Sequence, residues 1–183
     1  MYWIIPGTVL RIPREEAVRI EQQFGSMFLG GGMVLSQVTG ITGLEAYTVQ
    51  NWVKRGFLPP PDRKKYSMNQ LSRIIIINML KNVLPMERIC NMLSYINGEL
   101  DDDSDDIIDD SRLYFMFIHL AAHYRLMHNE SGRDTLIAQE LKNYVEPVPG
   151  AKERVANVLR IMLTAWASAQ MRQTADQLLK EIE

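Results

Sequence analysis

One face of a short predicted helix carries side chains that suit contacts with nucleobases. Tyr47, Gln50, Asn51 and Lys54 recur at the i, i+3, i+4 and i+7 spacing that places residues on one side of an α-helix. Asn and Gln amides can pair with adenine through two hydrogen bonds, and a Lys ammonium reaches guanine or a phosphate. Many plain solvated helix faces have a similar composition, so a second feature is needed to favour double-stranded DNA.

A basic loop follows this helix and supplies that second feature. Pro59–Pro61 cannot be helical and predicts a stiff extended segment, and Arg63, Lys64 and Lys65 then form an exposed tip. Such cations bind duplex phosphates or enter the minor groove, although a charge run alone is usually ordinary surface. Helix and loop together favour DNA. The residues predicted to contact it are Tyr47, Gln50, Asn51, Lys54, Arg55, Arg63, Lys64, Lys65 and Tyr66.

Histidines at positions 119 and 123 have the i, i+4 spacing that can hold a metal ion, and His128 lies beyond them. The surrounding sequence LYFMFIHLAAHY is typical of a core helix, and no Glu stands between the histidines as in a metalloprotease. We therefore expect hydrogen-bonded or surface histidines, with no metal and no cofactor.

Other signals of catalysis or metal binding are weak. The chain has no glycine-rich phosphate loop and no nucleophile elbow, so we expect no enzyme. The acidic stretch 99–110 lacks the central Gly and terminal Glu of an EF-hand loop and is interpreted as a solvated linker. Cys90, the single cysteine, excludes an intrachain disulfide and is expected to be a small buried hydrophobe.

Two helices are expected to position the candidate DNA face. The first runs from Met33 to about Thr39, with Gly40 as the turn residue. Thr42-Gly43-Leu44-Glu45 has the pattern of a capping box, and the second helix then runs to Arg55 and stops at Gly56. The opposite, apolar side of this second helix carries Leu44, Thr48, Val49, Trp52 and Val53.

Two further helices are expected behind the basic loop. Ser67-Met68-Asn69-Gln70 is a second capping box and opens a helix through Leu80. The run Ile74–Ile77 has the composition of a strand, but the caps favour a helix. Pro85 opens the next helix, to about Tyr95. Its inward positions are Ile89, Met92, Leu93 and Ile96.

The first 32 residues are expected to form an arm that covers this head. Pro13 suits a helix start, and an apolar stripe follows until glycines at 25 and 30–32 end it and provide a joint. The members of the stripe are Ala17, Ile20 and Phe24.

Helices are also expected after the acidic stretch. One covers about 112–128 and is apolar nearly all round for its first turns, which predicts burial on all sides. Ser131-Gly132 is interpreted as a turn, and a helix from about Asp134 to Tyr144 follows. The last segment, 151–183, has no Gly or Pro and is expected to be one helix. Its apolar seam consists of Val155, Leu159, Met162, Trp166 and Ala169.

Charge is segregated along the 183 residues, although the formal net charge is only −2. Residues 33–95 hold eight Lys and Arg against three acids, and residues 96–110 hold eight acids and no base. A basic head and an acidic connector are therefore expected. The apolar start of the chain lacks the basic residues and long apolar run of a signal peptide, which predicts a cytoplasmic protein without membrane segments.

The head resembles the MerR-type winged helix-turn-helix family of bacterial transcription regulators. The resemblance covers residues 33–93, about a third of the chain, and the whole chain also resembles an uncharacterised bacterial family with this type of head and no assigned effector. It is carried by motifs in the same order and spacing as in the family. These motifs are Leu35–Thr42, Thr48-Val49, Trp52, Gly56–Pro59, Arg63–Ser67, Leu71, Ile76 and Pro85–Ile89.

The departures from the family pattern concern contacts and assembly. The family usually has an Arg, an aromatic pair and a Glu where this chain has Gln50, Asn51, Trp52 and Val53, so Lys54 and Arg55 would have to replace a phosphate contact. Thr48 lies about one helical turn further from Thr42 than the family pattern expects. The wing is short and lacks the usual glycine, and the acidic stretch replaces the long dimerising helix. Cysteine ligands for a sensed metal are absent.

These features predict an all-α protein with a MerR-like winged helix-turn-helix head and a helical tail. Its segments are an arm (1–32), a DNA-binding head (33–97), an acidic linker (98–110) and a helical dimerisation or effector domain (111–183). The expected function is sequence-specific DNA binding in transcription regulation. The expected form is a homodimer through the C-terminal helices, with a small-molecule effector of unknown identity left open. Two alternatives are a protein-interaction or phage-type architectural module, and an enzyme built around His119 and His123.

Overall fold

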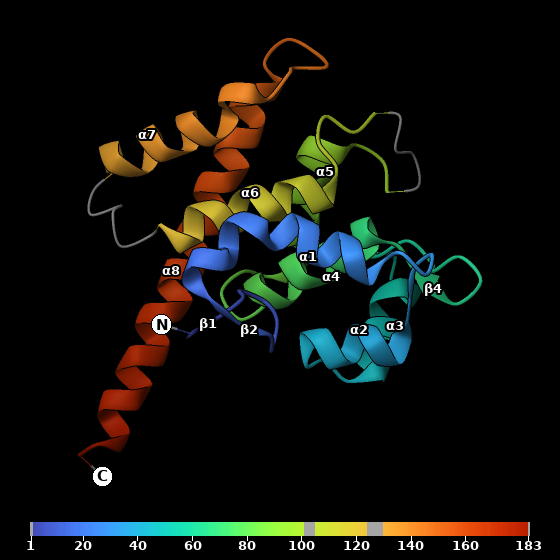
Figure 1. Ribbon diagram of the computed structural model, residues 1–183, viewed down its shortest axis with the longest axis horizontal. Coiled ribbons are helices and arrows are strands. Elements are labelled where there is room, and N and C mark those ends of the chain that lie inside the picture. Colours follow the sequence, from blue (N-terminus) through green and yellow to red (C-terminus); the bar gives the residue numbers. More distant parts are fainter. Residues whose placement is uncertain (1, 101–104, 124–129, 183) are drawn as a thin grey trace.

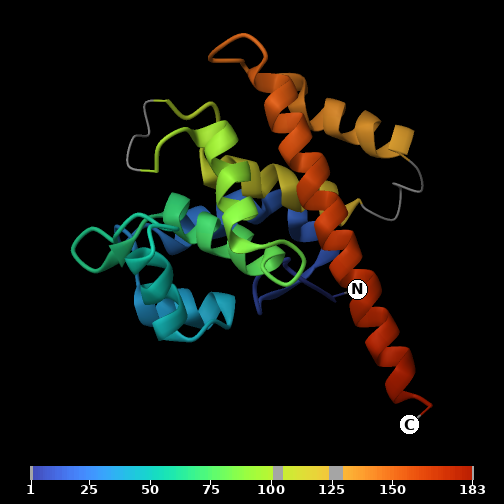
Figure 2. The same ribbon diagram turned by 180° about the vertical axis from the view of Figure 1, so that it is seen from behind.

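The computed structural model describes residues 2–100, 105–123 and 130–182, and the protein is mostly helical, as the sequence predicts (Figure 1; Figure 2). Two small antiparallel sheets of two strands each accompany the helices. The strands are β1 (Tyr2–Ile4) with β2 (Arg11–Pro13), and β3 (Met33–Val34) with β4 (Lys65–Tyr66). The helices are η1 (Arg14–Arg19), α1 (Ile20–Met27), α2 (Leu35–Thr42), α3 (Ala46–Lys54), α4 (Met68–Leu80), α5 (Met86–Asn97), α6 (Asp110–Ala122), α7 (Glu130–Glu140), η3 (Leu141–Asn143) and α8 (Ala151–Lys180).

Helices α4 and α6 pack against each other at the centre of the molecule. The four isoleucines 74–77 of α4 are all fully buried, and so are Leu113, Tyr114, Phe117 and Ile118 of α6. A helix buried on every side tolerates β-branched residues because packing outweighs their modest helix propensity. The prediction that Ile74–Ile77 is helical is confirmed, and so is the prediction that the helix after the acidic stretch is buried all round.

One of the two predicted capping boxes, the one at Ser67, is confirmed. At Ser67 the side chain accepts a hydrogen bond from the amide of Gln70, and the Gln70 side chain accepts one from the amide of Ser67. The predicted box at Thr42 is wrong. Thr42 is the last residue of α2, and its hydroxyl donates to the Val38 carbonyl in the preceding turn. Helix α3 begins after Glu45, whose side chain makes no capping hydrogen bond.

The turn between α2 and α3 is also displaced from its predicted place. Gly40, the predicted turn residue, lies inside α2, which continues to Thr42. Gly43 takes the left-handed conformation instead, with φ of 69°. Both positions are glycine, so sequence alone could not say which one requires a positive φ. Gly43 also lies close to Val9, where a Cβ atom would be 2.8 Å from the Val9 side chain.

The N-terminal residues form a wedge rather than only a covering arm. The loop between β1 and β2 lies against α4, where a Cβ on Gly7 would come within 2.5 Å of the Ile75 carbonyl oxygen. The amide of Val9 donates to the Ile41 carbonyl at 2.9 Å. Asn78 of α4 donates to the carbonyls of both Gly7 and Thr42 at 3.0 Å. This loop therefore joins the end of α2 to α4.

After this loop, η1 and α1 cover α6, so the arm contacts the tail as well as the head. The predicted stripe of Ala17, Ile20 and Phe24 is buried, as expected. The helix passes the predicted stop at Gly25 and ends at Met27.

In the tail, α8 is a single helix, as predicted, and runs along the side of the molecule opposite α2 and α3 (Figure 1; Figure 2). The predicted turn at Ser131-Gly132 is wrong, because both residues belong to α7. Residue 128 lies outside the described residues. Among the described residues, no helix is long and apolar enough to cross a bilayer.

Candidate nucleic-acid interface

Helix α3 presents a polar face to solvent and buries the opposite, apolar face. Tyr47 is 71% exposed, and Gln50, Asn51 and Lys54 are exposed beside it. On the opposite side Val49 and Trp52 are buried. The predicted division of this helix into an outer polar face and an inner apolar face is therefore confirmed.

The buried side of α3 contacts the residue that follows α4. The ammonium of Lys81, which caps the end of α4, lies 5.8 Å from the centre of the Trp52 ring. Burial lowers the pKa of Lys81 below its usual value. A cation placed over an indole is attracted by the ring electrons. This contact lies on the side of α3 that is opposite its exposed polar face.

The basic tip is a two-residue hairpin turn in an unusual conformation. The amide of Lys65 donates to the Asp62 carbonyl at 2.8 Å and closes the turn around Arg63 and Lys64. Both central residues have positive φ, 45° for Arg63 and 64° for Lys64. Hairpin turns with two positive φ angles normally use Asn and Gly, because a side chain with a Cβ is strained there. The chain thus carries two long cations at positions where they cost stability.

The two cations at the tip are exposed and unneutralised. Among the described residues, no acidic side chain forms an ion pair with Arg63 or Lys64. Lys65 differs, because its ammonium donates to the Gly30 carbonyl at 3.0 Å. Arg55 is also held in place, with its guanidinium 4.6 Å from the centre of the Phe57 ring. Among the described residues of the basic tip, Arg63 and Lys64 are therefore the two cations that offer positive charge without a protein partner.

Tyr66, which the sequence predicts as a DNA contact, is buried. Its side chain is 3% exposed, and burial raises the pKa of its hydroxyl. The reason is the alternation of side chains along β4, where Lys65 faces solvent and Tyr66 faces the core, opposite Met33 of β3. Tyr66 is therefore a supporting residue under the surface and not one of its exposed contacts.

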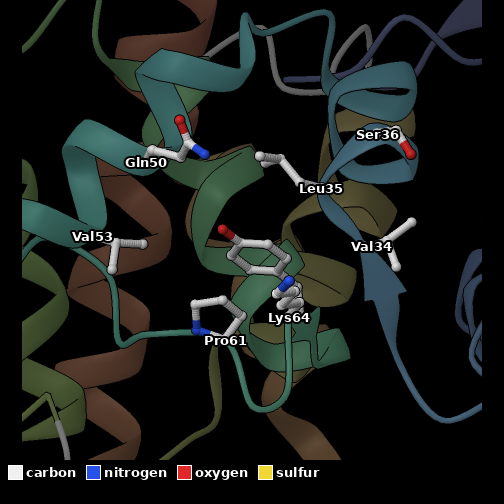
Figure 3. Close-up of a pocket in the computed structure, with 8 residues that line it drawn as sticks. Val34, Leu35, Ser36, Gln50, Val53, Pro61 and Lys64 are labelled. Carbon is white, nitrogen blue, oxygen red and sulfur yellow. The ribbon is translucent and has the colours of Figure 1, made fainter.

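A cavity of about 640 Å³ lies where α3, the start of α2 and the tip meet (Figure 3). Gln50 and Val53 of α3 form one side, Val34, Leu35 and Ser36 form another, and Pro61 and Lys64 close the end nearest the tip. Tyr66 also lines it. Gln50 and Lys64 thus share one cavity although they belong to different elements. The cavity shows that the outer face of α3 and the basic tip are neighbours.

The start of α2 adds a third polar feature to this cavity. Leu35 and Ser36 are the first two residues of α2, and their amides have no acceptor within the helix. The Gln37 side chain accepts from the Val34 amide at 3.0 Å and so closes the first turn. Helix starts carry partial positive charge and favour anions. The Lys64 ammonium and the start of α2, which both favour anions, therefore line one cavity together with the neutral amide of Gln50.

A buried ion pair anchors the loop that carries the tip. Arg73 of α4 and Asp110 of α6 lie 3.0 Å apart, and both side chains are almost fully buried. Arg73 also donates through Nε to the Phe57 carbonyl at 3.2 Å, and Asn97 of α5 donates to the other Asp110 oxygen at 2.9 Å. Burial raises the pKa of Asp110 above its usual value, and Arg73 opposes this rise. One network thus ties three helices to the segment that follows α3.

This network corrects the view of the acidic stretch as a solvated linker. Asp110 is buried, and so are Ile107 and Ile108 before it, whereas Asp109 is exposed and caps α6 by accepting from the Arg112 amide. Charge counting missed this because it treats all acids in a run alike. The useful signal was Arg73 itself, since an Arg among apolar residues of a buried helix requires a partner.

The other predicted polar groups of the tail are hydrogen-bonded. His119 lies 2.9 Å from Glu140 through Nδ1, and Nδ1 of His123 lies 2.8 Å from the His119 carbonyl oxygen. Among the described residues, no three potential ligands come together as a metal site. Cys90 is only half-buried, and burial raises its pKa.

Comparison with known proteins finds similarity over part of the chain. Residues 32–117 match the family described as "Domain of unknown function (DUF1836)". A stretch of 84 residues is 32% identical to "Uncharacterized protein YkrK" of Bacillus subtilis (strain 168), covering 44% of this chain. The chain covers 36% of the length of that relative. No solved structure matches the chain.

The extent of the family match agrees with the packing. It begins just before β3 and ends within α6, so it includes α3, the tip and the network of Arg73, Asn97 and Asp110. The similar segment therefore contains the candidate surface together with the helices that support it.

Proposed function

We propose that the protein binds double-stranded DNA with sequence preference and acts as a transcription regulator, with residues 33–97 as a MerR-like winged helix-turn-helix head. Helix α3 is the recognition helix and the turn around Arg63 and Lys64 is the wing. The observation that carries the proposal is the cavity shared by Gln50 and Lys64, which joins an exposed polar helix face to an unneutralised basic tip. Base-edge contacts and phosphate contacts are the two components that a specific DNA complex requires.

The roles of the residues follow from their positions. Gln50, Asn51 and Lys54 project from a helix narrow enough to enter a major groove, where Asn and Gln suit adenine. The start of α2 and the ammonium of Lys64 suit the phosphates of the strand beside that groove. Two copies of the head would read the two halves of a two-fold site, so we propose that the protein acts as a homodimer.

The proposal is tested first by selecting bound sequences from random DNA duplexes. A sequence-specific protein enriches one motif, and its affinity for that motif falls steeply as salt rises, because phosphate contacts release counterions. A protein that binds no duplex at low salt, or that enriches no motif, would refute the proposed function. Binding of all duplexes with equal affinity would favour the architectural alternative.

Substitutions of Asn51 and Lys64 are expected to weaken DNA binding in different ways. Asn51→Ala should weaken binding to the selected motif by about 1–3 kcal/mol and relax the preference at one base pair. Lys64→Ala should weaken binding to all duplexes similarly and lower the salt dependence by about one counterion. Fluorescence anisotropy with selected and scrambled duplexes measures both effects. Lys142→Ala, an exposed Lys of η3, is the control for loss of charge and should bind as the wild type does. Equal behaviour of all three variants would contradict these roles.

A further inference from the structure

Helix α8 carries two apolar stripes on opposite sides. In its first half, Val155, Leu159, Met162 and Trp166 are buried against the body of the protein. In its last turns the apolar residues are exposed, with Met171 at 69% and Leu178 at 58%. The helix leaves the body in this second half and projects into solvent (Figure 1; Figure 2).

The two stripes are separated by the geometry of the helix itself. Met162 and Met171 are nine residues apart, which is about two and a half turns at 3.6 residues per turn. Trp166 and Ala175 have the same separation. Side chains so spaced point in opposite directions, so the second stripe faces away from the surface on which the first stripe packs. A straight α8 therefore cannot bury its second stripe against its own chain.

The second stripe has the spacing of a helix-pairing seam. Met171, Ala175 and Leu178 follow one another at intervals of four and three residues, and Ile182 continues the pattern after another four. Leu179 widens the stripe on one side. Apolar residues at alternating intervals of three and four form the contact line of two-stranded coiled coils. An exposed seam of this kind is self-complementary, because a two-fold axis brings the same patch of two copies together.

The charges around the second stripe permit this pairing. Arg172 and Asp176 are four residues apart, and so are Asp176 and Lys180, which gives alternating sign along the helix away from the seam. Glu181 balances the second cation, so the segment has no net charge from residue 168 to residue 182. Two copies of this segment therefore approach each other without net repulsion.

We propose that residues 168–182, which are the end of α8 and the two residues after it, pack against the same segment of a second copy of this chain and form the dimer contact. This dimer contact extends the proposed function, which requires two heads in one assembly. The observations behind it are the direction and the exposure of the second apolar stripe of α8. The contact is short, with four seam positions in each copy, so a dimer of moderate affinity is expected.

The test is sedimentation equilibrium of the full chain without DNA. The wild type should show twice its mass of 21.1 kDa in the micromolar range, and the double variant Met171→Asp with Leu178→Asp should weaken dimerisation at least about tenfold. Both substituted residues are exposed in the single chain, so circular dichroism and thermal unfolding at low concentration should match the wild type. The matched control is Gln173→Asp with Gln177→Asp, which adds the same charge outside the seam and should remain dimeric.

The results separate this proposal from the proposed function. A wild-type monomer at about a hundred micromolar, or a seam variant that dimerises as the wild type does, would overturn the dimer contact. A dimer that binds no DNA would leave the contact standing and refute the regulator. A monomeric seam variant that still binds single half-sites, with reduced affinity for the paired site, would support both.

Discussion

Replacing Asp110 by alanine is expected to lower the free energy of unfolding by about 3–5 kcal/mol, because it leaves the guanidinium of Arg73 buried without its partner. Asn97 would lose its acceptor at the same time. Urea denaturation followed by circular dichroism measures the loss. Asp109→Ala is the neighbouring control, since it removes only the exposed cap of α6 and should cost about 1 kcal/mol. Equal losses for the two variants would show that the ion pair does not hold these helices together.

The same pair should be replaceable by apolar side chains. Burial raises the pKa of Asp110 despite the nearby guanidinium, so the loss of hydration outweighs the attraction between the two groups. The double variant Arg73→Met with Asp110→Leu is therefore expected to recover most of the stability that Asp110→Ala loses. The double variant also lacks the hydrogen bond from Arg73 Nε to the Phe57 carbonyl. If this bond holds the loop at Phe57 in position, the double variant will still bind DNA more weakly than the wild type.

Replacing Arg63 by Asn and Lys64 by Gly should make the protein more stable and a weaker DNA binder. Asn and Gly accept the positive φ angles of this turn, and the relief of strain at two positions is expected to add about 1–2 kcal/mol to the free energy of unfolding. Loss of the two proposed phosphate contacts should reduce DNA affinity by about tenfold to a hundredfold near physiological salt. Urea denaturation and fluorescence anisotropy on the same sample give both values.

A second variant separates strain from charge at the tip. Arg63→Ala with Lys64→Ala removes the same cations but keeps a Cβ at both positive-φ positions, so it should lose the affinity without gaining the stability. If the Asn-Gly variant bound DNA as well as the wild type, the tip would have no part in binding. If it were no more stable than the Ala-Ala variant, the turn would not be strained.

The sequence predicted the helices and the exposed face of α3 because these depend on local patterns. The apolar spacing of Val49 and Trp52 fixes which side of α3 faces inward, and the reciprocal bonds of Ser67 and Gln70 fix where α4 begins. Both signals lie within a few residues, so neither needs knowledge of the rest of the chain.

The errors arose where distant segments decide the outcome. Tyr66 is buried because β4 pairs with β3, more than thirty residues earlier in the chain. Gly43 rather than Gly40 takes the turn, beside Val9 from the N-terminal loop. Asp110 is buried, unlike its acidic neighbour Asp109, because it forms an ion pair with Arg73. Each of these contacts joins residues that no local pattern relates, so composition and periodicity could not reveal them.

The N-terminal wedge has a practical consequence for dissecting the protein. Asn78 joins the carbonyls of Gly7 and Thr42, and Tyr114 donates to the carbonyl of Pro6 at 2.8 Å. A fragment that starts at residue 33 would lose the Gly7 and Pro6 carbonyls and would expose Ile75, against which Gly7 lies. The smallest excisable unit that keeps the end of α2 joined to α4 thus begins near the first strand, although the matching family segment begins at residue 32.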